Sequence, residues 1–442
     1  MSRYKPYPAY KESGVEWLDD VPEHWNVKPI KIIVSCNNDS ISESMPLDMP
    51  IRYVDISAVS HNEGITVAES MLFGDAPSRA RRKAKVGDVV ISTVRTYLKA
   101  VASVDETHAD CVFSTGFAIL RARQKKLKPE FLKWLALNDL LIQAIESHSE
   151  GLSYPAINTS ELVNLKTVVP GLSEQTRISL ILDRETARID ALIAKKTRFI
   201  ELLKEKRQAL ITHAVTKGLN PNVKMKDSGV EWIGQVPEHW QTKRLKHLLE
   251  EPLQYGANES GDASIEDGPR YIRITDLNEA GELRHDSVKR LPTYVAQPYM
   301  LRDGDVLFAR SGATVGKTYC YRSEHGPACF AGYLIKARLD RKKVNPDFLI
   351  LAVRSHYYWA YILKTAIQAT IENVSAERYG DFPVAMPNCK EQATIVAALS
   401  SILSRIDALI EKTQCSINLL KERRSAFITA AVTGQIDLRE SI

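Results

Sequence analysis

The stretch RIDALIAKKTRFIELLKEKRQALITHAVT, at residues 188–216, returns 217 residues later, at 405–433, as RIDALIEKTQCSINLLKERRSAFITAAVT. Neither copy contains Gly or Pro, and apolar residues recur every three or four positions among Lys, Arg and Glu, which is typical of an amphipathic helix. The apolar positions match between the copies: Leu182, Ile189, Leu192, Ile193, Ile200, Leu203, Leu210 and Ile211, then Leu399, Ile406, Leu409, Ile410, Ile417, Leu420, Phe427 and Ile428. The sequence therefore predicts two long helices of one design.

The first of these helices, over residues 173–216, would have 44 residues and a length of roughly 66 Å, at about 1.5 Å per residue. Several of its apolar residues keep a seven-residue repeat, so each helix can bury its stripe on another helix. The pattern leaves three interpretations open. They are a long core helix, a coil between two copies of the chain, and an antiparallel pair within the chain that holds two globular units a fixed distance apart.

The repeat extends well beyond the helices. SGVEWLDDVPEHW at residues 13–25 returns as SGVEWIGQVPEHW at 228–240, and Gly-Asp-Val at 87–89 returns at 304–306. A Pro and then Glu-Gln mark the entry into each predicted helix, at 170 and 174–175 and again at 387 and 391–392. A repeat of this length indicates two modules built on one plan.

Between motif and helix, short apolar runs alternate with turn residues, and a helical pattern begins near Pro129 and Pro346. We therefore expect α/β (α+β) domains in two copies, joined by two long antiparallel helices as an intramolecular coiled coil with pseudo-two-fold symmetry. The predicted boundaries are an N-terminal arm at 1–25, a first variable domain at 26–169, a central helix region at 170–218, a second variable domain at 219–386, a C-terminal helix region at 387–434 and a tail at 435–442.

The composition permits nucleic-acid binding without demanding it, since 59 Lys+Arg against 54 Asp+Glu give a net charge of +5. Six cysteines without a CxxC pair indicate neither a zinc site nor a disulfide framework. The first residues lack the apolar core of a signal peptide, and no run of 18 apolar residues occurs. We expect a soluble protein inside the cell.

The segment SGATVGKT at residues 311–318 is similar to a phosphate-binding P-loop but does not complete one. The motif G-x-x-x-x-G-K-[ST] requires Gly five positions before Gly316, where this chain has Ser311. A second interpretation is a turn after the GDVLFA strand whose polar side chains suit phosphate oxygens or base edges, and a third is a solvated surface turn. The candidate DNA contacts here are Arg310, Ser311, Thr314 and Lys317.

The corresponding turn of the first half supplies a second set of candidates: Thr93, Arg95, Tyr97 and Lys99. A nearby basic run places five cations within residues 79–85 with no acid among them, which is either a solvated face or a phosphate contact. Its candidates are Arg79, Arg81, Arg82 and Lys83.

No catalytic or metal centre is predicted. His24 and His239 lie in the repeated PEHW without a further His or Cys at ligand spacing, so we expect them to pack a turn. No GxSxG or HExxH occurs.

Taken together, the GVEW–VPEHW motif, the Pro–Glu-Gln entry to each helix, the RIDALI and LLKE segments and the AVT endings resemble the specificity subunit of type I restriction-modification systems, the HsdS family. The resemblance covers nearly the whole chain. It implies two target-recognition domains, each reading one half of an interrupted duplex DNA site, with the helices setting the gap between the halves. It also implies a non-catalytic, cytoplasmic subunit that takes part in antiviral defence.

The same resemblance implies two methyltransferase (HsdM) subunits, which use S-adenosylmethionine, and two restriction (HsdR) subunits, which use ATP and Mg²⁺, while this chain itself binds no cofactor. The residues expected to build the frame or the partner dock are Trp17, Trp25, Glu174, Gln175, Trp232, Trp240, Glu391 and Gln392. No family motif identifies the DNA contacts. The alternatives are a P-loop nucleotide-binding protein and a coiled-coil scaffold without DNA contact.

Overall fold

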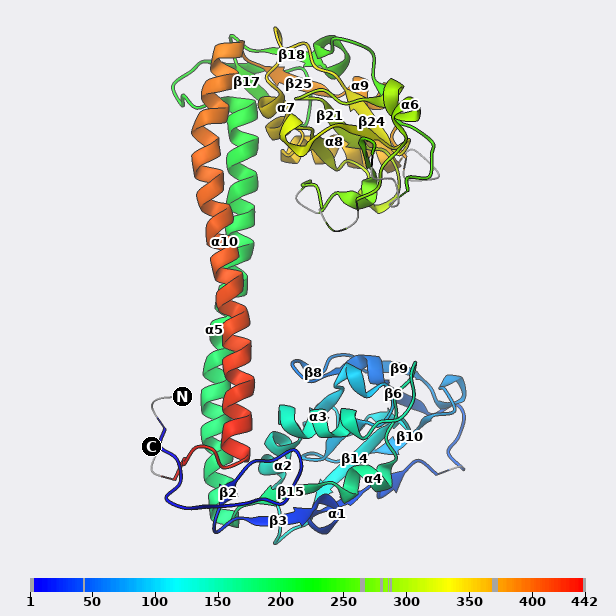
Figure 1. Ribbon diagram of the computed structural model, residues 1–442, viewed down its shortest axis with the longest axis vertical. Coiled ribbons are helices and arrows are strands. Elements are labelled where there is room, and N and C mark those ends of the chain that lie inside the picture. Colours follow the sequence, from blue (N-terminus) through cyan, green and yellow to red (C-terminus); the bar gives the residue numbers. More distant parts are fainter. Residues whose placement is uncertain are drawn as a thin grey trace. The chain divides into compact units, whose positions relative to one another are not determined.

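The computed structural model describes the chain except for residues 1–3, 43, 263–266, 279–280, 285, 287, 368–372 and 440–442. It divides into two compact units (Figure 1), unit 1 made of Met1–Thr197 with Cys415–Ile442, and unit 2 made of Arg198–Gln414. In Figure 1 unit 1 is coloured blue to teal and red, and unit 2 green to orange.

The elements of unit 1 are mostly short strands with helices between them. Its strands are β1 Tyr10–Lys11, β2 Val21–Pro22, β3 Asn26–Pro29, β4 Val34–Cys36, β5 Asp39–Ser40, β6 Pro50–Val54, β7 Val59–Ser60, β8 Gly64–Ile65, β9 Glu69–Leu72, β10 Ala80–Lys83, β11 Val89–Ser92, β12 Val101–Ser103, β13 Val112–Ser114, β14 Phe117–Ala122 and β15 Lys166–Val169. Its helices and 3-10 turns are α1 Ile30–Ile33, η1 Ile56–Ala58, η2 Phe73–Asp75, η3 Thr96–Leu98, α2 Pro129–Ala136, α3 Asp139–Ser147, α4 Thr159–Asn164, the first part of α5 (Leu172–Lys217) and the last part of α10 (Cys389–Val432).

Unit 2 holds the rest of α5 and α10. Its strands are β16 Met225–Asp227, β17 Gln235–Pro237, β18 Gln241–Arg244, β19 Gln254–Tyr255, β20 Arg270–Ile272, β21 Val306–Ala309, β22 Thr318–Cys320, β23 Ala328–Phe330, β24 Leu334–Ala337 and β25 Pro383–Met386. Its helices and 3-10 turns are η4 Leu245–Leu248, η5 Ile274–Asp276, α6 Thr293–Ala296, η6 Gln297–Tyr299, η7 Gly312–Thr314, η8 Ser323–His325, α7 Pro346–Ala352, α8 His356–Ile367 and α9 Ala376–Gly380.

The sheets preserve the internal repeat. The antiparallel order β12-β11-β14-β4 of unit 1 is the order β22-β21-β24-β19 of unit 2, and the pair β15-β3 corresponds to β25-β18. A parallel pair occurs in both units, as β13-β6 within the five-stranded sheet of unit 1 and as the two-stranded sheet β20-β23 of unit 2. The prediction of mixed α/β modules is confirmed. The helices expected near Pro129 and Pro346 are also confirmed, and Pro suits the first turn that each begins.

The long helices end within a few residues of the predicted positions, with 46 residues in α5 and 44 in α10. Unit 1 contains the start of α5 and the end of α10, so the two run antiparallel there and share one apolar core. Unit 2 contains the end of α5 and the start of α10, which also share a core. The buried residues correspond between the units: Ile178, Leu182, Ile428 and Val432 in unit 1, and Ile395, Leu399, Ile211 and Val215 in unit 2.

In each unit an ion pair joins α5 to α10. In unit 1 Arg424 Nε lies 3.0 Å from Asp190 Oδ1, close enough for an ion pair although the N–H is not aligned for a hydrogen bond. In unit 2 Arg207 Nε donates to Asp407 Oδ1 at 2.9 Å. The two pairs are images of each other under the 217-residue offset, so the helices have the same register in both units.

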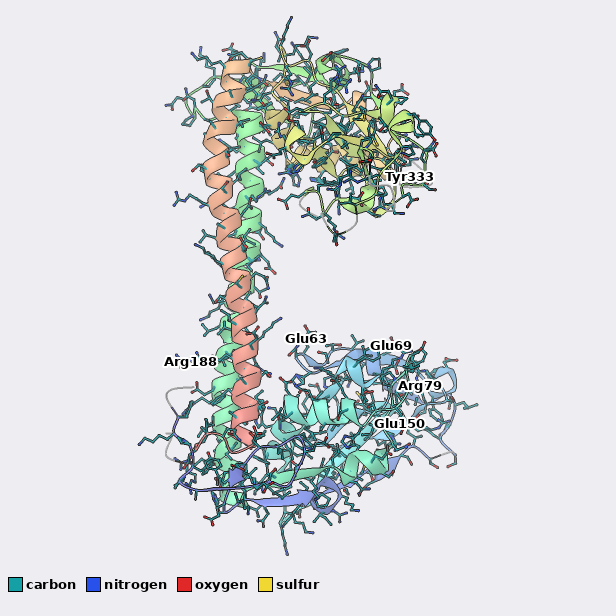
Figure 2. All side chains as sticks on the ribbon, in the orientation of Figure 1. Glu63, Glu69, Arg79, Glu150, Arg188 and Tyr333 are labelled. Atoms are coloured by element: carbon teal, nitrogen blue, oxygen red, sulfur yellow. The ribbon has the colours of Figure 1, made fainter. Side chains whose placement is uncertain are left out.

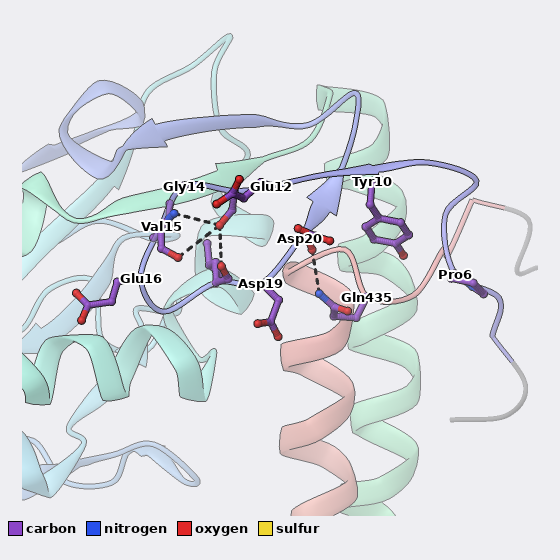
Figure 3. A pocket seen from close by; sticks show the side chains of 11 residues that line it. Pro6, Tyr10, Glu12, Gly14, Val15, Glu16, Asp19, Asp20 and Gln435 are labelled. Atoms are coloured by element: carbon purple, nitrogen blue, oxygen red, sulfur yellow. Dashed lines mark hydrogen bonds between the residues drawn. The ribbon is translucent and has the colours of Figure 1, made fainter.

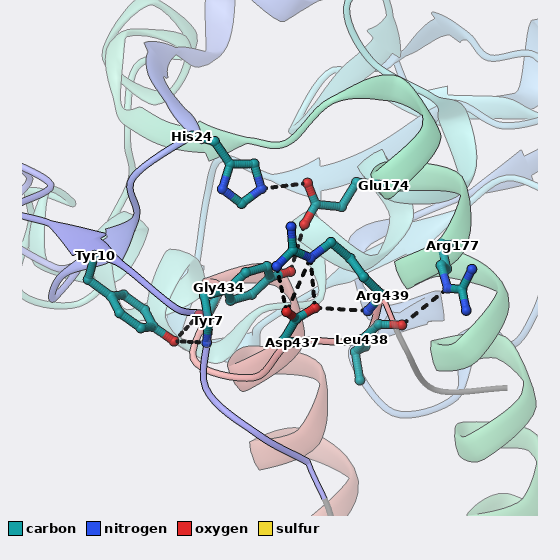
Figure 4. A network of polar contacts seen from close by, with 9 residues as sticks. All are labelled: Tyr7, Tyr10, His24, Glu174, Arg177, Gly434, Asp437, Leu438 and Arg439. Atoms are coloured by element: carbon teal, nitrogen blue, oxygen red, sulfur yellow. Dashed lines mark hydrogen bonds and ion pairs between the residues drawn. The ribbon is translucent and has the colours of Figure 1, made fainter.

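Both ends of the chain lie in unit 1, where they pack on the start of α5 (Figure 4). Tyr10 donates its hydroxyl to the Gly434 carbonyl at 3.0 Å, and the Arg439 guanidinium lies 4.9 Å from the centre of the Tyr7 ring. Leu438 is fully buried, and its carbonyl accepts from Arg177 Nε at 3.3 Å. In unit 2 the long helix α5 is joined to the opening motif by the continuous backbone of residues 218–227. In unit 1 the tail after α10 is held to the N-terminal arm, which includes the opening motif, by these non-covalent contacts.

Candidate nucleic-acid interface

The start of each long helix is anchored by a fully buried glutamine. Gln175 Oε1 accepts from the Lys128 N–H at 2.8 Å, and Gln175 Nε2 donates to the carbonyls of Lys126 and Pro170 at 3.2 and 2.9 Å. Gln392 makes the same bonds, at 2.7, 3.1 and 2.9 Å, with Asn345, Lys343 and Pro387. Both glutamines therefore fix the helix to the loop before α2 or α7, and neither is open to a partner.

The acid beside each glutamine holds the opening motif. His24 Nε2 lies 3.0 Å from Glu174 Oε2, and His239 Nε2 lies 2.9 Å from Glu391 Oε2. Each histidine therefore has the structural place that the sequence predicted.

The second oxygen of that acid is used differently in the two units. In unit 2 Trp240 Nε1 donates to Glu391 Oε1 at 3.1 Å. In unit 1 the Tyr7 hydroxyl donates to the same oxygen of Glu174 at 2.7 Å, and Trp25 Nε1 has no hydrogen-bond partner among the described residues. Burial raises the pKa of Tyr7, so its hydroxyl stays protonated and remains a donor.

The four predicted tryptophans differ in exposure. Trp25 and Trp240 have no exposed surface, so they are frame residues. Trp17 and Trp232 are half-buried, and Trp232 packs against Tyr361 and under the Lys364 ammonium of α8.

The Asp of the repeated Gly-Asp-Val is a frame residue that the sequence did not single out. Asp88 accepts two hydrogen bonds from Arg121, at 2.8 and 2.7 Å, and is 1% exposed. Asp305 accepts two from Arg338, at 3.1 and 2.8 Å, and is 2% exposed. Arg338 lies 217 residues after Arg121, so the repeat in the sequence could have identified this arginine as the partner of the aspartate. These charge-assisted pairs tie the strand before each candidate loop to the centre of its sheet.

The candidate loop of unit 1 joins β11 to β12 through η3. Arg95, Tyr97 and Lys99 are exposed, whereas Thr93 is buried and donates its hydroxyl to the Gly116 carbonyl at 3.0 Å. Thr93 therefore supports the loop from inside, which corrects its assignment as a DNA contact. The Arg95 guanidinium lies 5.0 Å from the centre of the Tyr154 ring, which brings a second exposed loop to the same surface.

The candidate loop of unit 2 joins β21 to β22 through η7. Arg310 lies 4.7 Å from the centre of the Tyr255 ring, and its Nε donates to Asn373 Oδ1 at 3.3 Å. Ser311, Thr314 and Lys317 are half-buried, and Thr314 donates its hydroxyl to the Ser311 carbonyl at 3.1 Å. Because Thr318 begins a strand antiparallel to β21, the loop does not open a helix, so the P-loop interpretation lacks its structural context.

The basic run of unit 1 lies along and beside β10, inside the five-stranded order β5-β10-β13-β6-β9. Arg79, labelled in Figure 2, pairs with Asp55 at 3.1 Å and donates from Nε to the Tyr53 hydroxyl at 3.1 Å. Arg81 stacks on Phe73, burial lowers the pKa of Arg82, and Lys83 is exposed. The run is therefore not one contiguous charged face.

Residues 237–419 match the Type I restriction modification DNA specificity domain. The chain is 23% identical to the Type I restriction enzyme MjaVIII specificity subunit of Methanocaldococcus jannaschii, over 71% of this chain and 69% of that protein. It is 21% identical to the putative MjaX specificity subunit of the same organism, over 97% and 98%. A solved chain described under complex assembly and conformational transition of the type I R-M system shares the fold, with a TM-score of 0.74 at 23% identity over 94% of this chain and 99% of that one.

This chain is similar to the specificity subunits of type I restriction-modification systems. Specificity subunits of type I systems are non-catalytic components for DNA recognition. No group of three or more His, Cys, Asp or Glu that could hold a metal ion occurs among the residues that the structure describes.

A hollow of about 750 Å³ lies in the opening motif of the chain (Figure 3). Its lining includes four acids, Glu12, Glu16, Asp19 and Asp20, and no basic residue. Negative charge repels DNA phosphates, so the hollow is not part of the candidate interface.

Within the described part of the chain, one helix, α10, contains an 18-residue window with a mean hydropathy of 1.6, long and apolar enough to cross a membrane by length and composition alone. Only 22% of that window is buried inside the chain. Its buried residues Ile395, Leu399 and Leu403 belong to the core shared with α5 in unit 2, which is the packing expected of an amphipathic stripe.

Proposed function

We propose that this subunit reads an interrupted duplex DNA site, one half with each unit, and that α5 and α10 together set the gap between the halves. The observation that carries the proposal is the repeat itself. The same buried frame, Gln175 with Asp88 and Gln392 with Asp305, supports two loops of equal length whose exposed side chains differ. Because the two units share the same buried frame but expose different loop side chains, each unit is suited to a different DNA half-site.

The gap follows from the helices if they form one antiparallel coil through both units. Two DNA-reading modules on a rigid element bind half-sites at a fixed separation, as dimeric readers do. The equal register of the Asp190–Arg424 and Arg207–Asp407 pairs supports a coil of constant geometry.

The helix pairs also suit the docking of two modification subunits. In unit 1 Leu192 and Leu419 are 41% and 65% exposed, and in unit 2 their images Leu409 and Leu202 are each 46% exposed. Apolar side chains repeated on a helix surface mark a site for partner helices. S-adenosylmethionine, ATP and Mg²⁺ then belong to the modification and restriction subunits, and the assembly works in the cytoplasm.

The test is a genome-wide map of methylated adenines in cells with and without this gene. We expect one interrupted motif, two short specified halves around a fixed unspecified gap, that disappears when the gene is deleted. An uninterrupted motif, or a map that does not change, would reject the proposal.

A further inference from the structure

The loop between β11 and β12 contains two cations in a backbone conformation that their side chains disfavour. Arg95 has φ 50° and ψ 50°, and Lys99 has φ 50° and ψ 40°, both in the left-handed region. L-residues other than Gly enter this region at a cost, because the Cβ approaches a carbonyl oxygen. An outlier of this kind is a reason to ask what the side chain does.

The second unit builds the same turn without that cost. The β11–β12 and β21–β22 hairpins have identical registers, so their loops correspond at the constant offset of 217 residues. The residues at the two left-handed positions are Gly312, with φ 65°, and Gly316, with φ 84°. Glycine is the ordinary residue for both places, and unit 1 has Arg and Lys there instead.

Neither cation packs into the apolar core of unit 1. Both are exposed, and no carboxylate lies within ion-pair distance of either in the part of the chain that the structure describes. Arg95 stacks only on Tyr154, which is itself 65% exposed, and Tyr97 between the two cations is 53% exposed.

The surrounding structure holds the loop rigidly enough to keep the unfavourable conformation. Thr96 is 4% exposed and donates its hydroxyl to Ser149 Oγ at 2.9 Å. Backbone bonds join the Thr93 carbonyl to the Ile157 N–H at 2.9 Å and the Ser92 N–H to the Ala100 carbonyl at 2.8 Å. The backbone that carries both cations is therefore fixed before any ligand arrives, which lowers the backbone entropy lost on binding.

We propose that Arg95 determines one base of the half-site read by unit 1 and that Lys99 binds the adjacent phosphate. This proposal rests on the proposed function. A planar guanidinium held against an aromatic ring is suited to the O6 and N7 of guanine, whereas an ammonium acts as a point charge for phosphate. Unit 2 has its ring-stacked Arg310 at the position of Thr93, so the two loops present different readers on one scaffold.

The test compares the full chain, assembled with its modification subunits, with the variants Arg95→Gly and Lys99→Gly. We measure binding to duplex DNA in which each base of the methylated motif is varied in turn. Arg95→Gly should bind the wild-type site about tenfold to a hundredfold more weakly and lose discrimination at one position of one half-site. Lys99→Gly should weaken binding equally for all sequences and lower the salt slope by about one.

The matched control is Lys125→Gly. Lys125 is an exposed lysine at φ 70° in the turn before α2, so it tests the same change of residue and backbone region outside the loop. Its DNA binding should equal that of the wild type. The melting temperatures of Arg95→Gly and Lys99→Gly should be unchanged or higher, because glycine fits the left-handed region without strain.

Arg95→Asn serves as a second variant, since Asn also tolerates this region. Wild-type affinity and wild-type discrimination at every base in a folded Arg95→Gly or Arg95→Asn would overturn the assignment of Arg95, as would a loss of melting temperature in both. An unchanged salt slope in Lys99→Gly would overturn that of Lys99. If instead the wild-type assembly shows no interrupted motif, the proposed function itself fails, and the two failures are distinguishable.

Discussion

At the scale of single residues, the fold depends on buried polar side chains that recur in both units. Gln175 and Gln392 have no exposed surface and satisfy backbone groups of a loop and of the helix entry at once. Buried polar groups that lose a partner destabilise a protein by more than the net value of the bond. This explains why one residue type serves the same place twice while the loops around it differ.

Replacing Gln175 by Ala should lower the free energy of unfolding of unit 1 by about 2–4 kcal/mol, because the Lys128 N–H and two carbonyls lose their partner. Hydrogen exchange followed by mass spectrometry should show faster exchange around α2 and no change around α7. The neighbouring variant Thr176→Ala is the control, since Thr176 is exposed and its change should be worth about 0.5 kcal/mol or less. Equal exchange in both variants would contradict the anchoring role.

At the scale of elements, the register of α5 against α10 is set by one ion pair in unit 1 and by an equivalent ion pair in unit 2. Asp190 and Arg207 of α5 pair with Arg424 and Asp407 of α10, and the boundary residues Thr197 and Gln414 lie between them at equivalent positions. An insertion in one helix alone would separate the partners of one ion pair and shift one apolar stripe. A change of helix length must therefore be made in both helices.

Inserting seven residues after Thr197 and seven after Gln414 keeps the apolar repeat and adds about 10 Å at 1.5 Å per residue. At roughly 3.4 Å per base pair, we expect the gap between the half-sites to lengthen by about three base pairs. Selection of bound DNA from a library with gaps of every length measures this. The single insertion after Thr197 is the control and should lower stability. A double insertion that folds and keeps the original gap would reject the role of the helices in spacing.

At the scale of the whole chain, the two units share one plan but are closed in different ways. In unit 2 a continuous backbone after Gly218 links the end of α5 to the opening motif. In unit 1 the end of α10 and the opening motif are held together by contacts between the N-terminal arm and the C-terminal tail. Ile436 and Leu438 are 5% and 0% exposed and belong to the core of unit 1 with Trp25. The tail therefore stabilises one unit only.

We expect Leu438→Ala to lower the free energy of unfolding of unit 1 by about 2–4 kcal/mol, the usual range for a leucine removed from a core. Hydrogen exchange should rise in the arm strands β1 and β2 and stay unchanged in their unit 2 counterparts, β16 and β17. Leu219→Ala is the control, because Leu219 is 45% exposed after α5. An equal rise in both units would contradict a tail that serves unit 1 alone.

The sequence by itself determined the repeat, the two long helices, the mixed α/β modules and several residues of the buried frame. These features are visible because helical periodicity, proline and glycine positions and repeat spacing are properties of local sequence. Trp25, Trp240 and Gln175 were found in this way, from their matching places in the two halves.

Only the tertiary structure decided which side chains of the loops face solvent and which support them. Thr93 is buried by contact with Gly116, Arg79 is paired with Asp55, and Asp88 is held by Arg121, each through residues distant in sequence. Likewise, Arg95 occupies a left-handed position because neighbouring strands impose the turn. Burial and backbone strain result from long-range packing, so spacing along the chain does not reveal them.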